Sequence, residues 1–225
     1  MSKSTPKRLA LAAVALCAAT TVVLAHGNVT PQAVDASALP AVGEDWLFEN
    51  PYRELHGAEF EKVLAIGDSA YNQNCARCHG LGVVSGGLAP DLRKLEAEEY
   101  GDEWFMERYR NGYTQSGITK MPGFGDLFGQ EVGWAIRLYA ETRPDDKSIA
   151  KHNAELVEIR DALKAWSGGD TASMEARLLE INGEIKTFSG APMADSVARR
   201  AALALADGDT EGAAEALTVG LSAAK

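Results

Sequence analysis

One short stretch, Cys75-Ala76-Arg77-Cys78-His79, decides the fold of this chain. The 225 residues include only three cysteines and four histidines, so composition alone does not explain this grouping. Two thiols three residues apart lie on one turn of a helix, and an imidazole follows directly after them. These groups are therefore expected to act together at one site.

The spacing of the two thiols suits the covalent attachment of haem. Cysteines on one helical turn can reach the two vinyl groups along one edge of a porphyrin and form a thioether with each. The residue that follows then lies under the iron, where an imidazole can bind it. The sequence therefore predicts one covalent haem c, held by Cys75 and Cys78, with His79 as an axial ligand of the iron.

Other uses of two close cysteines fit this sequence less well. A thioredoxin-like redox pair occurs in a βαβ unit, whereas the surrounding sequence has helical periodicity. A structural disulfide leaves the adjacent His79 without a role. A zinc site needs two further ligands, and the remaining histidines, His26, His56 and His152, each stand alone.

A second axial ligand has to come from further along the chain. Met106 falls in an apolar stretch with helical spacing, where packing in a core explains it. Met174 and Met193 lie in a separate C-terminal segment. Met121 directly precedes Pro122 in a stretch expected to be a loop, from which its thioether can reach the open haem face. We therefore expect Met121 to be the second ligand.

Residues 56–143 resemble a class I c-type cytochrome domain. Gly67 and Tyr71 stand four and eight residues before Cys75, on one face of the helix that leads into the motif. In that family such a pair meets the last helix of the domain, which here would offer Trp134, Leu138 and Tyr139. The resemblance implies an all-α fold with a single haem.

The stretch from Gly87 to Leu92 is similar to the proximal loop of the same family. There, a proline carbonyl accepts the Nδ1 proton of the haem histidine, which orients the ring and raises its basicity. The resemblance assigns this role to Pro90. An ordinary turn proline is the alternative.

A narrower resemblance covers more of the chain. The segments beginning at His26, at Asn50 and at Tyr71, together with the acidic helical tail, are similar to the PedF-type periplasmic cytochromes c. Such proteins resemble electron acceptors of quinoprotein (PQQ-dependent) alcohol dehydrogenases. The resemblance implies a one-electron carrier, not an enzyme, that accepts electrons from such a dehydrogenase and passes them toward a terminal oxidase or another cytochrome.

The N-terminus indicates export. Three basic residues precede the apolar run 9–24, which ends in the small residues that signal peptidase accepts. We therefore expect a signal peptide over residues 1–25, cleaved after Ala25, and a soluble periplasmic protein without stable membrane insertion. An uncleaved anchor and a lipoprotein attached through Cys17 are the alternatives. The net charge of −10 argues against a nucleic-acid partner, which needs a basic surface.

Helical periodicity defines the rest of the expected organisation. An extended lead over residues 26–56 wraps the following domain or frays. The cytochrome c domain is expected over residues 57–143, with little β-structure and with helices at 57–76, 91–98, 101–111 and 127–141. Pro144 then ends the last of these helices.

A helical extension is expected over residues 144–225. Apolar residues recur there at helical spacing in two series, which predicts an αα-hairpin. The first series runs from Ile149 to Trp166 and the second from Met174 to Phe188, and His152 falls on the first. Two Ala-rich helices are expected around 194–206 and 210–222, and together the four form a small bundle used for packing, docking or dimerisation.

Other functions remain open on the sequence alone. A haem-based sensor or adaptor, or an electron-transfer subunit docked on a larger dehydrogenase assembly through the C-terminal helices, would use the extension directly. A sensor or a peroxidase needs an open coordination position at the iron, and no second haem motif accompanies the first. Copper chelation by His26 at the processed N-terminus would need a second histidine, which the sequence does not identify.

Overall fold

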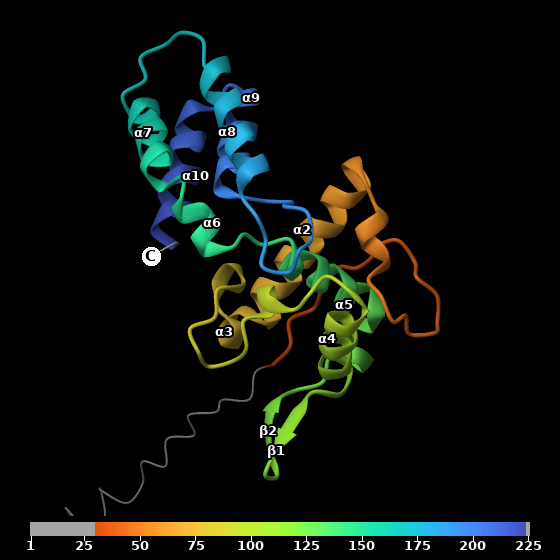
Figure 1. The fold of residues 1–225 in the computed structure, drawn as a ribbon. Coiled ribbons are helices and arrows are strands. Elements are labelled where there is room, and N and C mark those ends of the chain that lie inside the picture. Colours follow the sequence, from red (N-terminus) through yellow and green to blue (C-terminus); the bar gives the residue numbers. More distant parts are fainter. Residues whose placement is uncertain (1–29, 224–225) are drawn as a thin grey trace, which may run out of the picture. The chain divides into compact units, whose positions relative to one another are not determined.

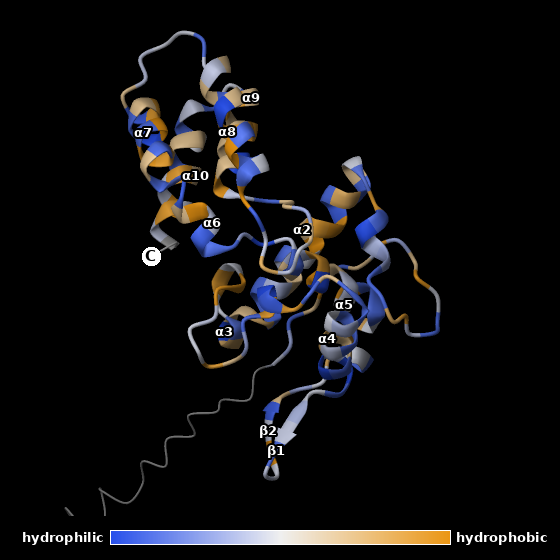
Figure 2. Ribbon diagram, viewed as in Figure 1, coloured by the Kyte–Doolittle hydropathy of each residue, from blue (hydrophilic) through white to orange (hydrophobic). Residues whose placement is uncertain are grey.

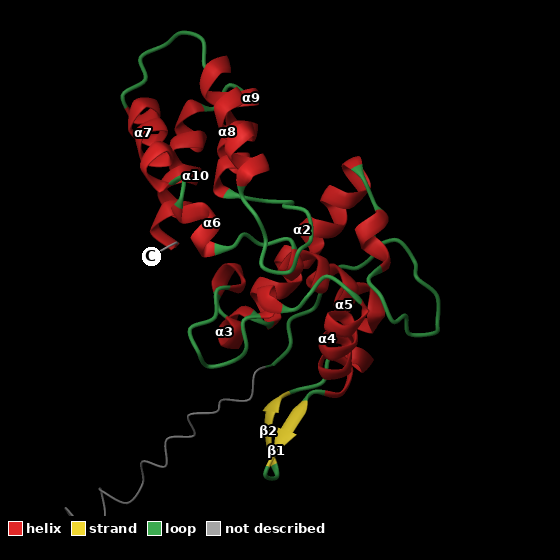
Figure 3. Cartoon of the chain, viewed as in Figure 1, coloured by secondary structure: helices red, strands yellow, loops and turns green. Residues whose placement is uncertain are grey.

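The structure is a computed structural model that describes residues 30–223. The predictions for the signal peptide, its cleavage after Ala25, and His26 lie outside the described residues. The chain divides into two compact units, residues 1–31 and 32–225. The described part of the second unit is helical with one small two-stranded sheet, which confirms the predicted all-α class (Figure 3).

Residues 32–143, called here the motif region, contain four α-helices and three short 3₁₀ helices (Figure 1). The α-helices are α2 (Gly57–Asn74), α3 (Ala76–His79), α4 (Glu99–Asn111) and α5 (Gly125–Glu141). The 3₁₀ helices are η1 (Pro51–Glu54), η2 (Leu81–Val83) and η3 (Leu92–Lys94). A hairpin of β1 (Tyr113–Gln115) and β2 (Ile118–Met121) joins α4 to α5.

The predicted helix at 91–98 is wrong, because only η3 forms there. The side chain of Asp91 accepts a hydrogen bond from the backbone N–H of Arg93, which caps a single turn, and the backbone is extended again at Leu95. Short polar side chains that bind nearby backbone in this way compete with helix propagation.

The second difference concerns the segment around Met121, which was expected to be a loop. The antiparallel hairpin turns at Ser116 and Gly117, whose φ angles are 52° and 76°. Positive φ at both central residues is typical of a type I′ turn, whose twist matches that of a two-stranded ribbon. Met121 therefore ends a strand, opposite Tyr113.

Helices α2 and α5 form the centre of the motif region, as the resemblance implied. A β-carbon on Gly67 would lie 2.1 Å from the carbonyl oxygen of Ala135, so only glycine permits this close approach. One turn further along, the rings of Tyr71 and Tyr139 are 5.4 Å apart between centroids. Trp134 and Leu138 are buried in the same core.

Residues 32–56 of the lead are bound to the helices of the motif region, so this part of the lead wraps them and does not fray. The side-chain amide of Gln130 donates to the carbonyls of Gly43 and Asp45, and its oxygen accepts from the N–H of Leu47. The hydroxyl of Tyr52 donates to the carbonyl of Pro40.

A buried ionic network fastens the end of the lead to α4 and α5. Arg53 donates to Asp102 at 2.6 Å and to Glu141 at 2.7 and 2.9 Å. Arg137 donates to Asp102 at 2.8 Å and to two backbone carbonyls that precede α4. The backbone N–H of Asn50 completes the cluster by donating to Asp102 at 2.9 Å.

Residues 144–223, called here the C-terminal extension, have a hydrophobic core of their own. The helices are α6 (Asp146–Ala150), α7 (Asn153–Lys164), α8 (Ala172–Glu184), α9 (Val197–Ala206) and α10 (Thr210–Ala223). Helices α7 to α10 carry both hydrophobic and hydrophilic residues (Figure 2), and the predicted hairpin residues Leu156, Leu163, Leu178, Ile181 and Ile185 lie in the core.

Two details of the extension differ from the prediction. The first expected helix is divided into α6 and α7 at Lys151 and His152, and the partly buried imidazole of His152 lies 3.7 Å from a carboxylate oxygen of Glu184. Helix α8 ends at Glu184, so Phe188 lies beyond it and packs against the guanidinium of Arg93.

Of the helices that the structure describes, none has the length and apolar character needed to cross a membrane.

The close contact at Gly67 generates a stability prediction. Gly67→Ala places a methyl group against the Ala135 carbonyl and should lower the free energy of unfolding by roughly 1–3 kcal/mol, because the two helices must separate. Denaturant unfolding followed by circular dichroism measures the loss. Gly183→Ala in α8 is the control: a β-carbon there meets nothing within 4 Å, so stability should stay equal or rise by up to about 1 kcal/mol. Equal stability of the two variants would contradict the packing described.

Candidate functional site

The sequence motif lies where α2 passes into the single turn of α3. The N–H of Cys75 still donates to the carbonyl of Tyr71 at 2.8 Å, and the N–H of His79 donates to the carbonyl of Cys75 at 3.0 Å. Gly80 ends the turn with a φ of 88°, and a β-carbon there would lie 1.9 Å from the Val84 carbonyl oxygen. The Tyr71 hydroxyl donates to the Gly80 carbonyl at 2.8 Å, which fixes the turn from the side of the core.

The imidazole of His79 is buried and held in one orientation. Its Nδ1 lies 2.9 Å from the carbonyl oxygen of Pro90. A carbonyl can only accept, so Nδ1 carries the proton and Nε2 keeps a free lone pair. Burial lowers the pKa of His79, against the opposing effect of the Pro90 hydrogen bond. The structure therefore presents a neutral imidazole whose second nitrogen is ready to bind a metal.

The two cysteines are free thiols, each partly buried. Burial raises the pKa of Cys75 to about 12, with a further contribution from Cys78, so the thiol is neutral at physiological pH. Two thiols and one imidazole nitrogen on consecutive turns are a donor set that suits covalently attached haem.

The alternatives raised by the sequence find no support in the described residues. In residues 30–223, no group of three or more His, Cys, Asp or Glu side chains is placed so that it could hold a metal ion. The only sheet in that part of the chain is the antiparallel hairpin, and a thioredoxin-like unit needs parallel strands joined by a helix. Cys75 and Cys78 form no disulfide.

The backbone around Met121 is fixed by two glycines that the sequence analysis did not single out. A β-carbon on Gly112, whose φ is 72°, would lie 2.4 Å from the Met121 carbonyl oxygen. A β-carbon on Gly123 would lie 2.6 Å from the carbonyl oxygen of Arg110, at the end of α4. The sequence could have indicated both glycines, because Gly112 directly follows a predicted helix and Gly123 directly follows Pro122.

The Met121 side chain is partly buried and packs on the same hydrophobic core as Cys75. Within this core, a row of stacked aromatic rings joins α4 to the start of α5, with neighbouring centroids 5.8 to 6.1 Å apart: Phe105, Tyr109, Phe124 and Phe128. Met106 is buried in this core, as predicted from its helical spacing. Met106 is therefore a packing residue, and Met121 is the methionine at the edge of the core.

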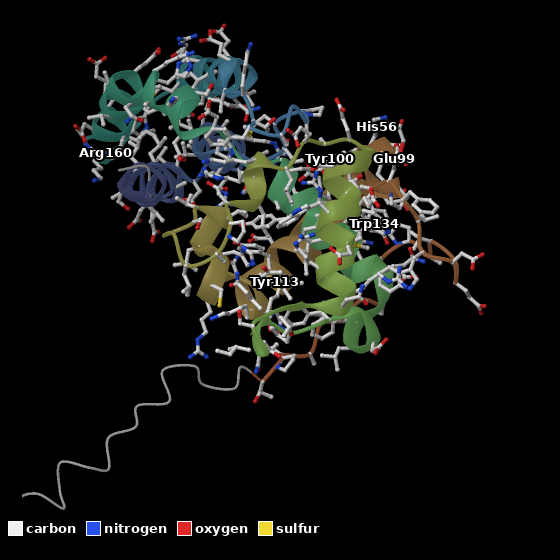
Figure 4. The ribbon with its side chains drawn as sticks, turned by 60° about the horizontal axis from the view of Figure 1, so that its bottom comes forward. His56, Glu99, Tyr100, Tyr113, Trp134 and Arg160 are labelled. Carbon is white, nitrogen blue, oxygen red and sulfur yellow. The ribbon has the colours of Figure 1, made fainter. Side chains whose placement is uncertain are left out.

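Both candidate ligand segments carry apolar side chains that reach solvent. Leu81 and Leu88, in the segment after His79, are 77% and 78% exposed. Tyr113 and Ile118, in the hairpin that ends at Met121, are 45% and 55% exposed (Tyr113 is labelled in Figure 4). Large exposed apolar side chains such as these can cover a hydrophobic group. A porphyrin has this character.

Known proteins share the sequence of this region. Residues 63–139 match the family model described as cytochrome c oxidase, cbb3-type, subunit III. The chain is 55% identical over 119 residues to cytochrome c550 of Pseudomonas aeruginosa, a match that covers 53% of this chain and 81% of that protein. No solved structure matches the chain.

Two larger proteins match over shorter stretches. The chain is 36% identical over 94 residues to the quinohemoprotein alcohol dehydrogenase ADH IIB of Pseudomonas putida and 38% identical over 83 residues to ADH-IIG of the same species. These matches cover 42% and 37% of this chain, but only 13% and 11% of the dehydrogenases.

The glycine contact at Met121 generates the next prediction. Gly112→Ala should lower stability by roughly 1–3 kcal/mol more than Gly117→Ala, because only at position 112 does the new methyl group meet the Met121 carbonyl. Both glycines have positive φ, 72° and 76°, and a β-carbon on Gly117 meets nothing within 4 Å. Denaturant unfolding gives the difference, and the NMR signal of the Met121 methyl group should move only in Gly112→Ala. An unchanged methyl signal in that variant would contradict the contact.

Proposed function

The chain belongs to the c-type cytochromes, and from this premise we propose that it is a periplasmic one-electron carrier with one covalently attached haem c. The observation that carries the proposal is the 2.9 Å contact between His79 Nδ1 and the Pro90 carbonyl, which leaves Nε2 to bind iron. The thiols of Cys75 and Cys78 would each add across one vinyl group, sulfur to one carbon and hydrogen to the other. When bound, the haem supplies a couple that takes up and releases one electron.

The residues of this chain determine which reactions such a group can support. His79 and Met121 would together hold the iron and leave no position for a substrate, so electron transfer would remain and peroxidase chemistry would not. The thioether of Met121 favours the reduced state more than a second imidazole would. Burial against the apolar core acts in the same direction, because the oxidised state carries the additional charge.

We propose a quinoprotein (PQQ-dependent) alcohol dehydrogenase as the electron donor and a terminal oxidase or another cytochrome as the acceptor. The similarity to two quinohemoprotein alcohol dehydrogenases supports the donor. Oxidation of an alcohol to an aldehyde releases two electrons and two protons, so the reduced quinone of the donor would need two successive visits by this carrier. A brief encounter through a small interface suits such an exchange.

The alternative function is an electron-transfer subunit of a larger dehydrogenase, or a haem-based sensor or adaptor, that uses the extension for docking. The observation in its favour is that residues 144–223 form helices with a separate core outside the matched family region of 63–139. A sensor needs an open coordination position at the iron. Carbon monoxide should therefore bind the reduced protein if it is a sensor, and should not bind readily if it is the carrier.

The ligand assignment predicts a specific spectroscopic loss. In haem-loaded protein, Met121→Ala should abolish the weak far-red absorbance of the oxidised form that reports sulfur–iron bonding. The same change should lower the reduction potential and allow carbon monoxide to bind the reduced form, because the thioether is gone. Met106→Leu is the matched control: it keeps the band and costs less than about 1.5 kcal/mol, since it conserves volume in the core.

Two results would contradict the carrier proposal. A wild-type protein without the far-red band that binds carbon monoxide readily has an open iron position, and the sensor function then explains it better. Loss of the band in Met106→Leu and its retention in Met121→Ala would exchange the roles of the two methionines.

Two exposed cations, Arg77 within the motif and Lys120 beside Met121, lie next to the proposed ligands on an otherwise acidic chain. Lys120→Glu should slow reduction by the dehydrogenase by roughly two- to five-fold at low ionic strength, because a charge at the rim of an interface acts mainly on the association rate. Lys164→Glu, an equal charge change at the end of α7, should leave the rate unchanged. Stopped-flow rates at several salt concentrations test this, and equal effects of the two variants would show that the charge near Met121 does not orient the donor.

A further inference from the structure

The guanidinium of Arg93 joins the motif region to the C-terminal extension and is almost completely buried, with 2% of the residue exposed. It binds the carboxylate of Asp91 through Nε at 3.0 Å and Nη2 at 2.8 Å. It binds the carboxylate of Asp146, the first residue of α6, through Nη1 at 2.7 Å and Nη2 at 3.0 Å. Nη1 also donates to the Pro144 carbonyl at 3.1 Å. An arginine has five N–H donors, and all five are used here.

An aromatic ring from the extension covers the same guanidinium. The centre of the Phe188 ring lies 5.1 Å from Cζ of Arg93, which is a cation–π distance. The Phe188 segment is itself fixed to the motif region by the hydrogen bond from the N–H of Ala97 to the carbonyl of Ser189, at 2.9 Å. Two separate pieces of the extension therefore hold Arg93 in place.

The fixed guanidinium in turn holds Asp91, at one end of the peptide unit that carries the Pro90 carbonyl. This carbonyl belongs to the planar, rigid peptide unit between Pro90 and Asp91. The Asp91 side chain is bound by Arg93 at both oxygens, and its Oδ1 also accepts from the Arg93 backbone N–H at 3.1 Å. A displacement of the Asp91 Cα would move this peptide unit and carry the carbonyl away from His79 Nδ1, and it would have to break the Asp91–Arg93 contacts.

We propose that the extension positions the proximal hydrogen bond: Asp146 and Phe188 hold Arg93, Arg93 holds Asp91, and Asp91 aims the Pro90 carbonyl at His79. This inference rests on the proposed function, because it matters only when His79 binds the haem iron. A well-aimed carbonyl raises the basicity of the imidazole, which stabilises the more highly charged oxidised state. Releasing the carbonyl therefore weakens that stabilisation and raises the reduction potential.

The chain supplies a matched control for this connection. Glu61 on α2 binds Arg199 on α9 at 2.6 Å, so it too joins the motif region to the extension. The side chains of Glu61 and Asp146 are both 47% exposed. Neutralising either carboxylate removes one negative charge and one ion pair, but only Asp146 leads to the Pro90 peptide unit.

The test compares haem-loaded Asp146→Asn and Glu61→Gln with the wild type. The exchange of the His79 Nδ1 proton with solvent, followed by NMR in the reduced protein, reports the hydrogen bond directly. It should become about tenfold faster in Asp146→Asn and stay unchanged in Glu61→Gln, because only the first loosens the acceptor. At a fixed ambient potential, the ratio of reduced to oxidised protein should rise about threefold in Asp146→Asn, which is about 28 mV at 59 mV per tenfold change.

A second variant removes the ring without changing charge. Phe188→Leu should shift proton exchange and potential in the same direction as Asp146→Asn, whereas Asp146→Glu, which keeps the carboxylate, should return both toward the wild-type values. Circular dichroism confirms that each variant is folded.

The inference would be overturned if the His79 Nδ1 proton exchanged at the wild-type rate in both Asp146→Asn and Phe188→Leu. It would also be overturned if Glu61→Gln accelerated this exchange as much as Asp146→Asn does. Wild-type protein that carries no covalent haem, measured by mass, would instead overturn the proposed function before any variant is compared.

Discussion

Two carboxylates, those of Asp102 and Glu141, are completely buried and depend on the guanidinium groups of Arg53 and Arg137. Burial raises the pKa of Glu141, and the hydrogen bond from Arg53 acts against that rise. Removing one partner of such a cluster leaves a buried charge uncompensated and typically costs about 3–5 kcal/mol. The lead, α4 and α5 therefore have to assemble together, and this requirement explains why the lead wraps the helices.

The helices fixed in this way carry both proposed ligand segments. Helix α5 packs on α2 through the glycine contact at Gly67, and α2 runs directly into the turn that presents His79. Helix α4 runs into the hairpin that ends at Met121, where Gly112 holds the Met121 carbonyl against the helix end. Sites supported by rigid elements hold their geometry better than sites on loops. A carrier benefits from this, because ligands that do not move between redox states add little to the barrier for electron transfer.

The features predicted from the sequence pattern itself are those that depend on residues close together in the chain, whereas the distant contact of Gly67 and Tyr71 with α5 was implied by the family resemblance. The motif at Cys75–His79 needs only five consecutive positions, and the long helices α2, α4 and α5 follow from periodicity. The prediction failed at 91–98, where the Asp91 cap and the tertiary bonds of Arg93 override local helix preference. The ionic network could not be predicted either, because its members are far apart in sequence and charged residues are usually exposed.

The same distinction applies to the C-terminal extension, whose helices follow from periodicity but whose connection to the motif region does not. Pro144, Asp146 and Phe188 meet one guanidinium, and that group leads within three residues to the carbonyl that orients His79. Binding free energies between linked sites are reciprocal. A protein that docks on the extension and displaces Asp146 would therefore change the redox equilibrium, and the redox state would change the affinity for that protein by the same factor. Through the proposed connection, an extension outside the matched family region of 63–139 would make the electron carrier responsive to a protein that docks on it.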